Sequence, residues 1–196
     1  MVDVITPMKP CSSCSLQTSA SLLKKGLCYY CRPATIQAHN KELAIKALLE
    51  AQLGHIDFVH DKVNEAILDC ACRRYRPDFW AELPTFVLVI EVDEHQHEQY
   101  EPSCELRRLV ELLAACMGKP LVVIRYNPDA YMIQGETQRT STKKRQAVLI
   151  DRIQKYENNY LDKILTVEYM FYTDLRQAEL ETELATQLQA YVSAGE

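Results

Sequence analysis

The chain has 196 residues, a length that allows one full domain and a small accessory module. Hydrophobic residues make up 47% and charged residues 25%, and no apolar run reaches the roughly 18 residues that span a bilayer. A net charge of −5 disfavours a protein that coats nucleic acid by bulk charge. The first residues lack a basic start followed by an apolar stretch, so we expect an intracellular protein with no membrane partner.

Four of the eight cysteines form two Cys-x-x-Cys pairs near the start of the chain. The pairs are Cys11-x-x-Cys14 and Cys28-x-x-Cys31, and Gly26 suits a tight turn before the second one. Four thiolates at this spacing can complete a tetrahedral zinc site, which leaves no open position for catalysis. The surrounding segment has too few apolar residues for a core, so bound zinc would supply its folding energy. We predict a structural zinc module over residues 1–36, with a redox pair or unligated thiols as the alternatives.

The segments that follow alternate between helical and strand-like apolar spacing. This order predicts an α/β fold, in which helices flank a mixed central sheet over residues 37–173 and a C-terminal helix occupies 174–196. The predicted elements, in chain order, are a helix at 39–53, strands at 55–61, 72–80 and 86–92, a helix at 101–117, a strand at 120–126, a helix at 144–157, a strand at 165–172 and a helix at 174–192.

The last of these helices carries apolar residues near heptad spacing. Such a stripe can pair two subunits, or it can pack back onto the domain, which is the commoner arrangement. The spacing therefore leaves a homodimer open. The residues of this stripe are Leu175, Leu180, Leu184, Leu188 and Tyr191.

Three carboxylates stand at the ends of predicted strands. Glu91 and Asp93 are two positions apart at the end of a very apolar strand, so they project to the same face. If the strand around Asp78 pairs beside it, all three carboxylates converge. Such oxygen-rich clusters suit Mg²⁺ or Mn²⁺, which can activate water and neutralise a phosphodiester oxyanion. The alternatives are a solvated strand end and an aspartate that caps a turn.

The order of these motifs resembles that of the PD-(D/E)xK restriction-endonuclease-like superfamily. The matching residues are Arg76-Pro77-Asp78-Phe79, an apolar strand ending in Glu91-Val92-Asp93, and a nearby histidine. The resemblance covers roughly residues 39–130, and it is strongest to the branch of very-short-patch repair and phage homing endonucleases. The segments HEQYEPSCELRRLVELL and PLVVIRYNPD also resemble that branch. Asp93 stands where the superfamily usually has a lysine, so the residue that orients the attacking water stays open.

By position, the resemblance implies a catalytic Mg²⁺ or Mn²⁺ bound by Asp78, Glu91 and Asp93. It implies His97, or His95 if the local turn differs, as general base or as the acid of the leaving group. Glu42 in the first helix occupies a place where the superfamily often has another acidic ligand. Clustered basic residues are candidates for contacts with nucleic acid. They are Arg76, Arg107, Arg108, Lys143, Lys144 and Arg145.

The activity that the resemblance implies is hydrolysis of duplex or structured DNA, leaving 5′-phosphate and 3′-hydroxyl ends. A catalytically inactive, nuclease-like subunit of a larger nucleic-acid complex is the main alternative, and an RNA-processing nuclease is a third. The short architecture favours a viral or mobile-element context.

Overall fold

The structure is a computed structural model that describes residues 8–13, 15, 17–20, 23, 26–27, 40–61, 64–68, 74–97 and 102–194. Within these ranges some side chains lie outside the description, among them those of His95, His97 and Arg107. The chain forms two compact units, Met1–Ala44 and Ile45–Glu196. The boundary between these two units lies inside the first helix, and the C-terminal helix belongs to the second unit.

The described elements of the first unit are a short antiparallel hairpin and the start of a helix. The second unit contains the rest of that helix and the α/β domain. In chain order the elements are β1 (Met8–Pro10), β2 (Gln17–Ser19), α1 (Asn40–Gln52), β3 (Val59–His60), β4 (Asn64–Leu68), β5 (Arg74–Tyr75), β6 (Phe79–Glu82), β7 (Val87–Val92), the 3₁₀ helix η3 (Glu94–His97), α2 (Pro102–Ala115), β8 (Leu121–Tyr126), β9 (Met132–Ile133), β10 (Glu136–Thr137), α3 (Thr142–Asn158), β11 (Leu165–Met170) and α4 (Asp174–Ala194).

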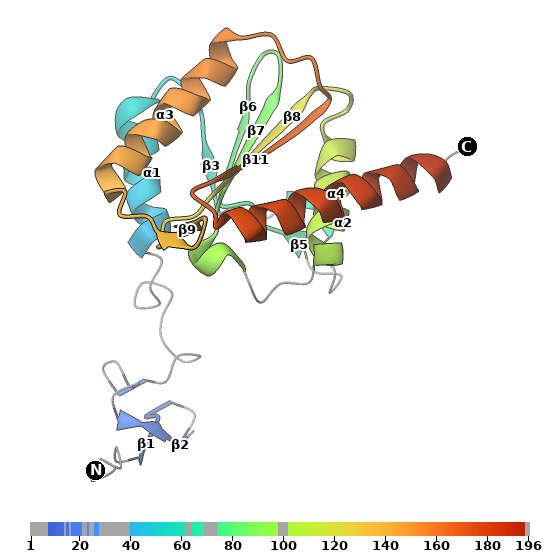
Figure 1. Cartoon of the computed structure of the whole chain (residues 1–196). Coiled ribbons are helices and arrows are strands. Elements are labelled where there is room, and N and C mark those ends of the chain that lie inside the picture. Colours follow the sequence, from blue (N-terminus) through green and yellow to red (C-terminus); the bar gives the residue numbers. More distant parts are fainter. Residues whose placement is uncertain are drawn as a thin grey trace. The chain divides into compact units, whose positions relative to one another are not determined.

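A five-stranded mixed sheet forms the centre of the second unit (Figure 1). Its strand order is β11-β8-β7-β6-β3, in which β11, β8 and β7 are parallel while β6 and β3 run antiparallel to their neighbours. The parallel pairs are joined by helical crossovers, β7–α2–β8 and β8–α3–β11, as parallel pairing requires. The predicted α/β fold with a mixed central sheet is confirmed.

Both faces of this sheet are covered. One face packs against α1 and α3 through residues such as Leu88, Ile90 and Ile124, which we call the first cluster. The other face packs against α2 and α4 through residues such as Val89 and Val123, the second cluster. Every residue of β7 and β8 is buried, which explains why their sequences are continuous apolar runs rather than alternating ones.

The strand boundaries differ from the sequence prediction at two places, where a proline or a tight turn determines where a strand ends. The predicted strand at 72–80 is interrupted around Pro77, because proline has no N–H for a sheet ladder. The hairpin β9–β10 was not predicted. Its two-residue loop, Gln134-Gly135, has positive φ at both positions, as a type I′ turn requires, but Gln-Gly is a weak signal for such a turn.

Helix α4 packs onto its own domain. Leu180 is buried and Leu184 packs against the second cluster, so two residues of the heptad-like stripe are used within the chain. Leu175, at the start of the same stripe, is 77% exposed. Among the described residues, no helix is long and apolar enough to cross a membrane.

Candidate functional site

The sheet places Asp78 beside Glu91. The pairing of β6 with β7 ends with Phe79 opposite Ile90, and Asp78 and Glu91 are the residues directly beyond this pair. Side chains alternate between the two faces of a sheet, so Glu91 falls on the face of the second cluster, with Val89 of the same strand. Asp78 directly precedes β6, and its carboxylate bonds to the backbone of Val92, the residue after Glu91. Two carboxylates that are 13 positions apart in the chain are therefore neighbours at one edge of the sheet.

Hydrogen bonds to backbone groups position Asp78 on both sides. Its Oδ2 accepts a 2.7 Å hydrogen bond from the Val92 N–H, next to Glu91. Its carbonyl oxygen accepts from the Asp61 N–H at 3.0 Å. Arg76 donates in turn to the carbonyl and to Oδ2 of Asp61, at 3.0 and 2.7 Å. This set of contacts ties the start of β6 both to β7 and to the end of β3.

Glu91 lies where two chain segments leave the sheet toward opposite faces. After β7 the chain continues into α2, which packs on the second cluster, whereas after β8 it continues into α3, which packs on the first. In open α/β sheets, ligands bind outside the carboxyl ends of strands at such a divergence. Glu91 is 7% exposed and is paired in register with Arg125 of β8. The divergence therefore coincides with the predicted carboxylate site.

Asp93, the third predicted ligand, is fully buried in an ion pair. Its Oδ2 accepts from Nε of Arg125 at 2.5 Å and also from the hydroxyl of Tyr172. Asp93 and Arg125 have exposed fractions of 0% and 5%. In the described part of the chain, no three His, Cys, Asp or Glu side chains meet in a group that could hold a metal ion. The structure thus brings Asp78 and Glu91 together but turns Asp93 toward a cation of the neighbouring strand.

Tyr172 follows β11 and closes this buried group. Burial raises the pKa of its hydroxyl strongly, and the negative charge of Asp93, which accepts the hydrogen bond, raises it further. The neutral, protonated hydroxyl is therefore the form that the folded protein stabilises.

This shift predicts a pH dependence of stability. Above about pH 10 the unfolded chain loses the tyrosine proton while folded Tyr172 keeps it, so the unfolded state binds fewer protons. The free energy of unfolding should then fall by up to about 1.4 kcal/mol per pH unit from this group alone. Urea unfolding of wild type and Tyr172→Phe from neutral pH to above pH 10 measures it, and the variant should show the shallower fall. Tyr160→Phe, at an exposed side chain, is the matched control, and equal slopes in all three proteins would refute the assignment.

Further buried polar residues brace the same edge of the sheet. Asn127, directly after β8, donates through Nδ2 to the Phe171 carbonyl at 2.8 Å and accepts from the Asp129 N–H. Gln96 of η3 has φ +55° and accepts from the Thr173 N–H at 2.7 Å. These bonds tie the segments after β7, β8 and β11 to one another.

The predicted basic residues have different roles in the structure. Arg145 is buried, and its guanidinium donates to the carbonyls of Asn127 and Asp129 at 3.3 and 2.6 Å, so it holds the end of β8. Lys143 and Lys144 are exposed in the first turn of α3. Because Arg145 bonds this turn to the segment directly after β8, the turn lies at the carboxyl-end edge of the sheet, where Glu91 also lies. Arg108 is half-buried on α2, and the side chain of Arg107 lies outside the described residues.

The remaining predicted site residues are the two histidines and Glu42. His95 and His97 lie in η3, which follows β7 directly, but their side chains are outside the described residues. Glu42 lies in the first turn of α1, within the first compact unit rather than in the unit that carries Asp78 and Glu91.

In the first unit, the backbone around Cys11 forms a turn next to Gly26. Cys11 is 2% exposed, and its Sγ accepts from the Ser13 N–H at 3.5 Å. The Ser12 N–H donates to the Gly26 carbonyl at 3.0 Å, and Gly26 has φ +79°, where glycine is favoured. A backbone hydrogen bond thus joins the first predicted knuckle to Gly26, two residues before the second cysteine pair in the sequence. Cys14, Cys28 and Cys31 lie outside the described residues.

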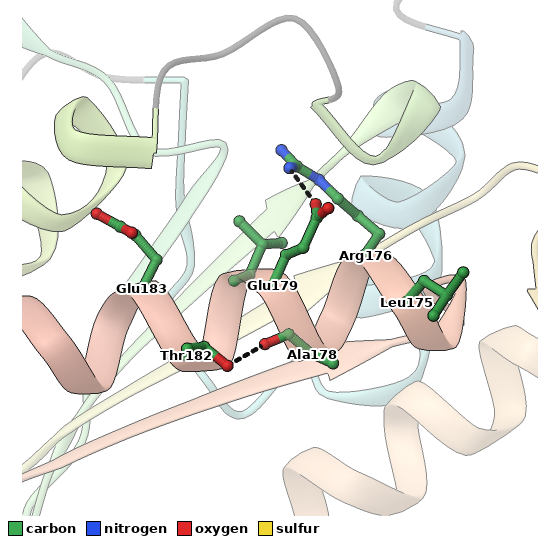
Figure 2. Close-up of a pocket in the computed structure, with 7 residues that line it drawn as sticks. Leu175, Arg176, Ala178, Glu179, Thr182 and Glu183 are labelled. Carbon is green, nitrogen blue, oxygen red and sulfur yellow. Dashed lines mark hydrogen bonds and ion pairs between the residues drawn. The ribbon is translucent and has the colours of Figure 1, made fainter.

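A surface pocket of about 660 Å³ runs along α4 (Figure 2). Among its lining residues, Arg176 and Glu179 form an ion pair at 3.2 Å, and Thr182 donates to the Ala178 carbonyl at 2.7 Å. None of its lining residues belongs to the carboxylate group at the sheet edge.

Sequence reasoning missed Arg125, Tyr172 and Gln96. Arg125 had a signal, because it is the single charged residue in the apolar run of residues 121–126. Tyr172 and Gln96 had none, since tyrosine at a strand end and glutamine in a polar turn are both ordinary.

Comparisons of the chain with protein-family models, with curated proteins and with solved structures gave no match.

Proposed function

We propose that this chain is a metal-dependent endonuclease that hydrolyses DNA phosphodiester bonds, and that its second unit is a PD-(D/E)xK-like nuclease core. The observation that carries the proposal is that Asp78, directly before β6, accepts from the Val92 N–H through Oδ2 and so lies next to Glu91 of β7. Leaving aside the separate β4–β5 pair, α1 is followed by the three antiparallel sheet strands β3, β6 and β7, then by α2 and the parallel strand β8, an order that supports the proposal.

The two carboxylates fit a hard divalent cation. Mg²⁺ is commonly held by one or two carboxylates together with water and substrate phosphate oxygens, so a third protein ligand is not required. Bound there, the metal would polarise a phosphoryl oxygen and lower the pKa of a water molecule. Asp78 and Glu91 would hold it at a fixed place, because backbone hydrogen bonds and strand pairing restrict both residues.

The chain's own residues would supply the rest of the chemistry. His97 or His95, in the 3₁₀ helix η3 that follows β7, would accept or donate a proton, since histidine changes charge near neutral pH. Lys143 and Lys144, exposed at the same edge of the sheet, would contact the DNA backbone. Product ends with a 5′-phosphate and a 3′-hydroxyl are expected.

We further propose that Cys11, Cys14, Cys28 and Cys31 bind one structural zinc ion. The burial of Cys11, the N–H that its sulfur accepts and the hydrogen bond from Ser12 to Gly26 support this. A zinc knuckle has the same requirements, a buried sulfur and a tight turn.

One observation favours the alternative, a catalytically inactive nuclease-like subunit that binds nucleic acid within a larger complex. Asp93 is engaged by Arg125 and Tyr172, which removes one of three predicted ligands from the site. The same experiment decides between the two functions.

The test is cleavage of supercoiled, linear and branched DNA, and of matched RNA, with Mg²⁺, Mn²⁺ or EDTA. We expect wild type to cut DNA only with a divalent metal, and Asp78→Asn to lose activity by more than about 100-fold, since even outer-shell partners of metal ligands contribute about 10- to 100-fold. Asparagine keeps an oxygen that can accept from the Val92 N–H, so the fold should persist.

The matched control is Asp57→Asn, at an exposed aspartate of the same unit, which should cut like wild type. A wild type that binds DNA but cuts nothing under any metal condition would favour the binding subunit. Preferential cleavage of RNA would indicate the RNA-processing nuclease instead.

A further inference from the structure

We propose that Gln96 is a positioning residue, whose side chain holds η3, the turn that contains His95 and His97, at the carboxyl-end edge of the sheet. The proposal rests on the proposed function, in which one of these histidines transfers a proton. In this role Gln96 acts through the backbone of η3 and not on the substrate. It belongs to none of the motifs that the sequence singled out.

The hydrogen bonds of Gln96 join η3 to a distant part of the chain. The side chain is buried, with 6% of its surface exposed, and Oε1 accepts a 2.7 Å hydrogen bond from the Thr173 N–H, 77 positions away. The Gln96 N–H donates to the Asp93 carbonyl at 3.0 Å, which closes the 3₁₀ turn. One residue thus shapes η3 and fixes it to the segment between β11 and α4.

Thr173, to which η3 is tied, is itself held by two further hydrogen bonds. Its carbonyl accepts from the Gln177 N–H at 2.9 Å, in the first turn of α4. Its Oγ1 accepts from the Met132 N–H at 3.2 Å, in the β9–β10 hairpin. A side chain can position a catalytic group only when its own partner is held in place. The helix and the hairpin meet that requirement for Thr173.

The backbone of Gln96 has a conformation that glutamine rarely adopts. Its φ is +55°, in the left-handed region, and such strain persists only where the surrounding structure imposes it. Asp61 and Phe171 also have positive φ, 45° and 63°, and they directly follow β3 and β11. Because β3, β7 and β11 run in the same direction, all three residues lie beyond the edge of the sheet where Asp78 and Glu91 lie. Strained residues cluster at functional sites, where they fix the geometry in advance.

The test removes the acceptor oxygen and keeps the shape of the side chain. Gln96→Met has about the length of glutamine but offers no oxygen to the Thr173 N–H. Gln96→Glu keeps such an oxygen, so it is the variant that should restore function. Gln134→Met is the matched control, because Gln134 is also a glutamine with left-handed φ, at +52°, but is exposed in the β9–β10 turn.

The measurements separate positioning from a role in the fold alone. Initial rates of DNA cleavage with Mg²⁺ give kcat and KM separately. Electron paramagnetic resonance measures Mn²⁺ affinity without substrate. Hydrogen–deuterium exchange followed by mass spectrometry reports how firmly the η3 backbone is held, and urea unfolding reports whether each variant folds.

We expect Gln96→Met to cut about 10- to 100-fold more slowly, since a displacement of about 1 Å at a catalytic group can cost about 100-fold. The loss should lie in kcat, with KM and Mn²⁺ affinity as in wild type, and the η3 amides should exchange faster. Gln96→Glu should recover most of the rate, and Gln134→Met should behave as wild type. If Gln96→Met does not fold, Gln96→Gly replaces it, with Gln134→Gly as its control, because glycine adopts positive φ without strain.

A folded Gln96→Met with wild-type kcat would overturn the proposal even if its stability falls, because the hydrogen bond would then serve the fold alone. Equal losses in Gln96→Met and Gln96→Glu would also overturn it, and so would a loss of rate without faster exchange in η3. Lower Mn²⁺ affinity in Gln96→Met would show an effect on the metal site instead, and would contradict the assigned role. A wild type that cuts no DNA would refute the proposed function itself, so the two failures are distinguishable.

Discussion

Glu91→Gln should fold and should lose DNA cleavage by more than about 100-fold, the upper range for outer-shell partners of a metal ligand. Glu91 is buried at the end of β7, next to Asp78, and glutamine preserves its size while removing the charge that a divalent cation needs. Initial rates on supercoiled DNA with Mg²⁺ measure the effect. The control is Glu136→Gln, at an exposed glutamate of β10, which should cut like wild type.

The combination of Glu91→Gln with Asp78→Asn sharpens this prediction. If both residues hold one metal ion, the second substitution removes nothing further, so the double variant should be no slower than the slower single variant. Losses that multiply would show that the two carboxylates act independently. Near-wild-type activity of Glu91→Gln would contradict the proposed metal site.

The purified chain should carry about one zinc ion, and Cys28→Ser should lose it. Structural zinc contributes about 10–16 kcal/mol of apparent binding free energy in small zinc-binding peptides, more than a segment with so few apolar residues gains from burial. Mass spectrometry measures the zinc content. Limited proteolysis should then cut the Cys28→Ser chain within residues 1–44 much faster than wild type.

Cys116→Ala is the matched control. Cys116 is buried in the second unit, where its thiol donates to the Leu112 carbonyl and burial raises its pKa to about 11. Such a thiol stays protonated near neutral pH, and a thiol that stays protonated does not ligate a metal. The control should therefore retain its zinc, and zinc that persists in Cys28→Ser would contradict the four-cysteine site.

The sequence predicted the central strands and the long helices well, for a physical reason. Strands β7 and β8 are buried on both faces, so they are continuous apolar runs, and α2 has apolar residues at helical spacing. The β9–β10 hairpin was not predicted because its turn depends on two residues with positive φ, Gln134 and Gly135, and glutamine is not typical of such a turn.

The candidate site divides in the same way. The two-residue period of a strand predicts that Glu91 and Asp93 project to the same face, and the resemblance of the Pro77-Asp78 motif singled out Asp78. The engagement of Asp93 by Arg125 and Tyr172 did not follow. These partners are 32 and 79 positions away in the chain, and no local pattern specifies which of them it meets.

By itself, therefore, the sequence determined the α/β class, the two cysteine pairs and the carboxylates at the strand ends, because these depend on residue type and short-range periodicity. The tertiary structure alone decided that β8 lies beside β7 in a register that sets Arg125 opposite Glu91, and that the end of β11 brings Tyr172 to Asp93. Strand order and register depend on how distant segments pack around a common core. The identity of the buried cation and of its partners could come only from that packing.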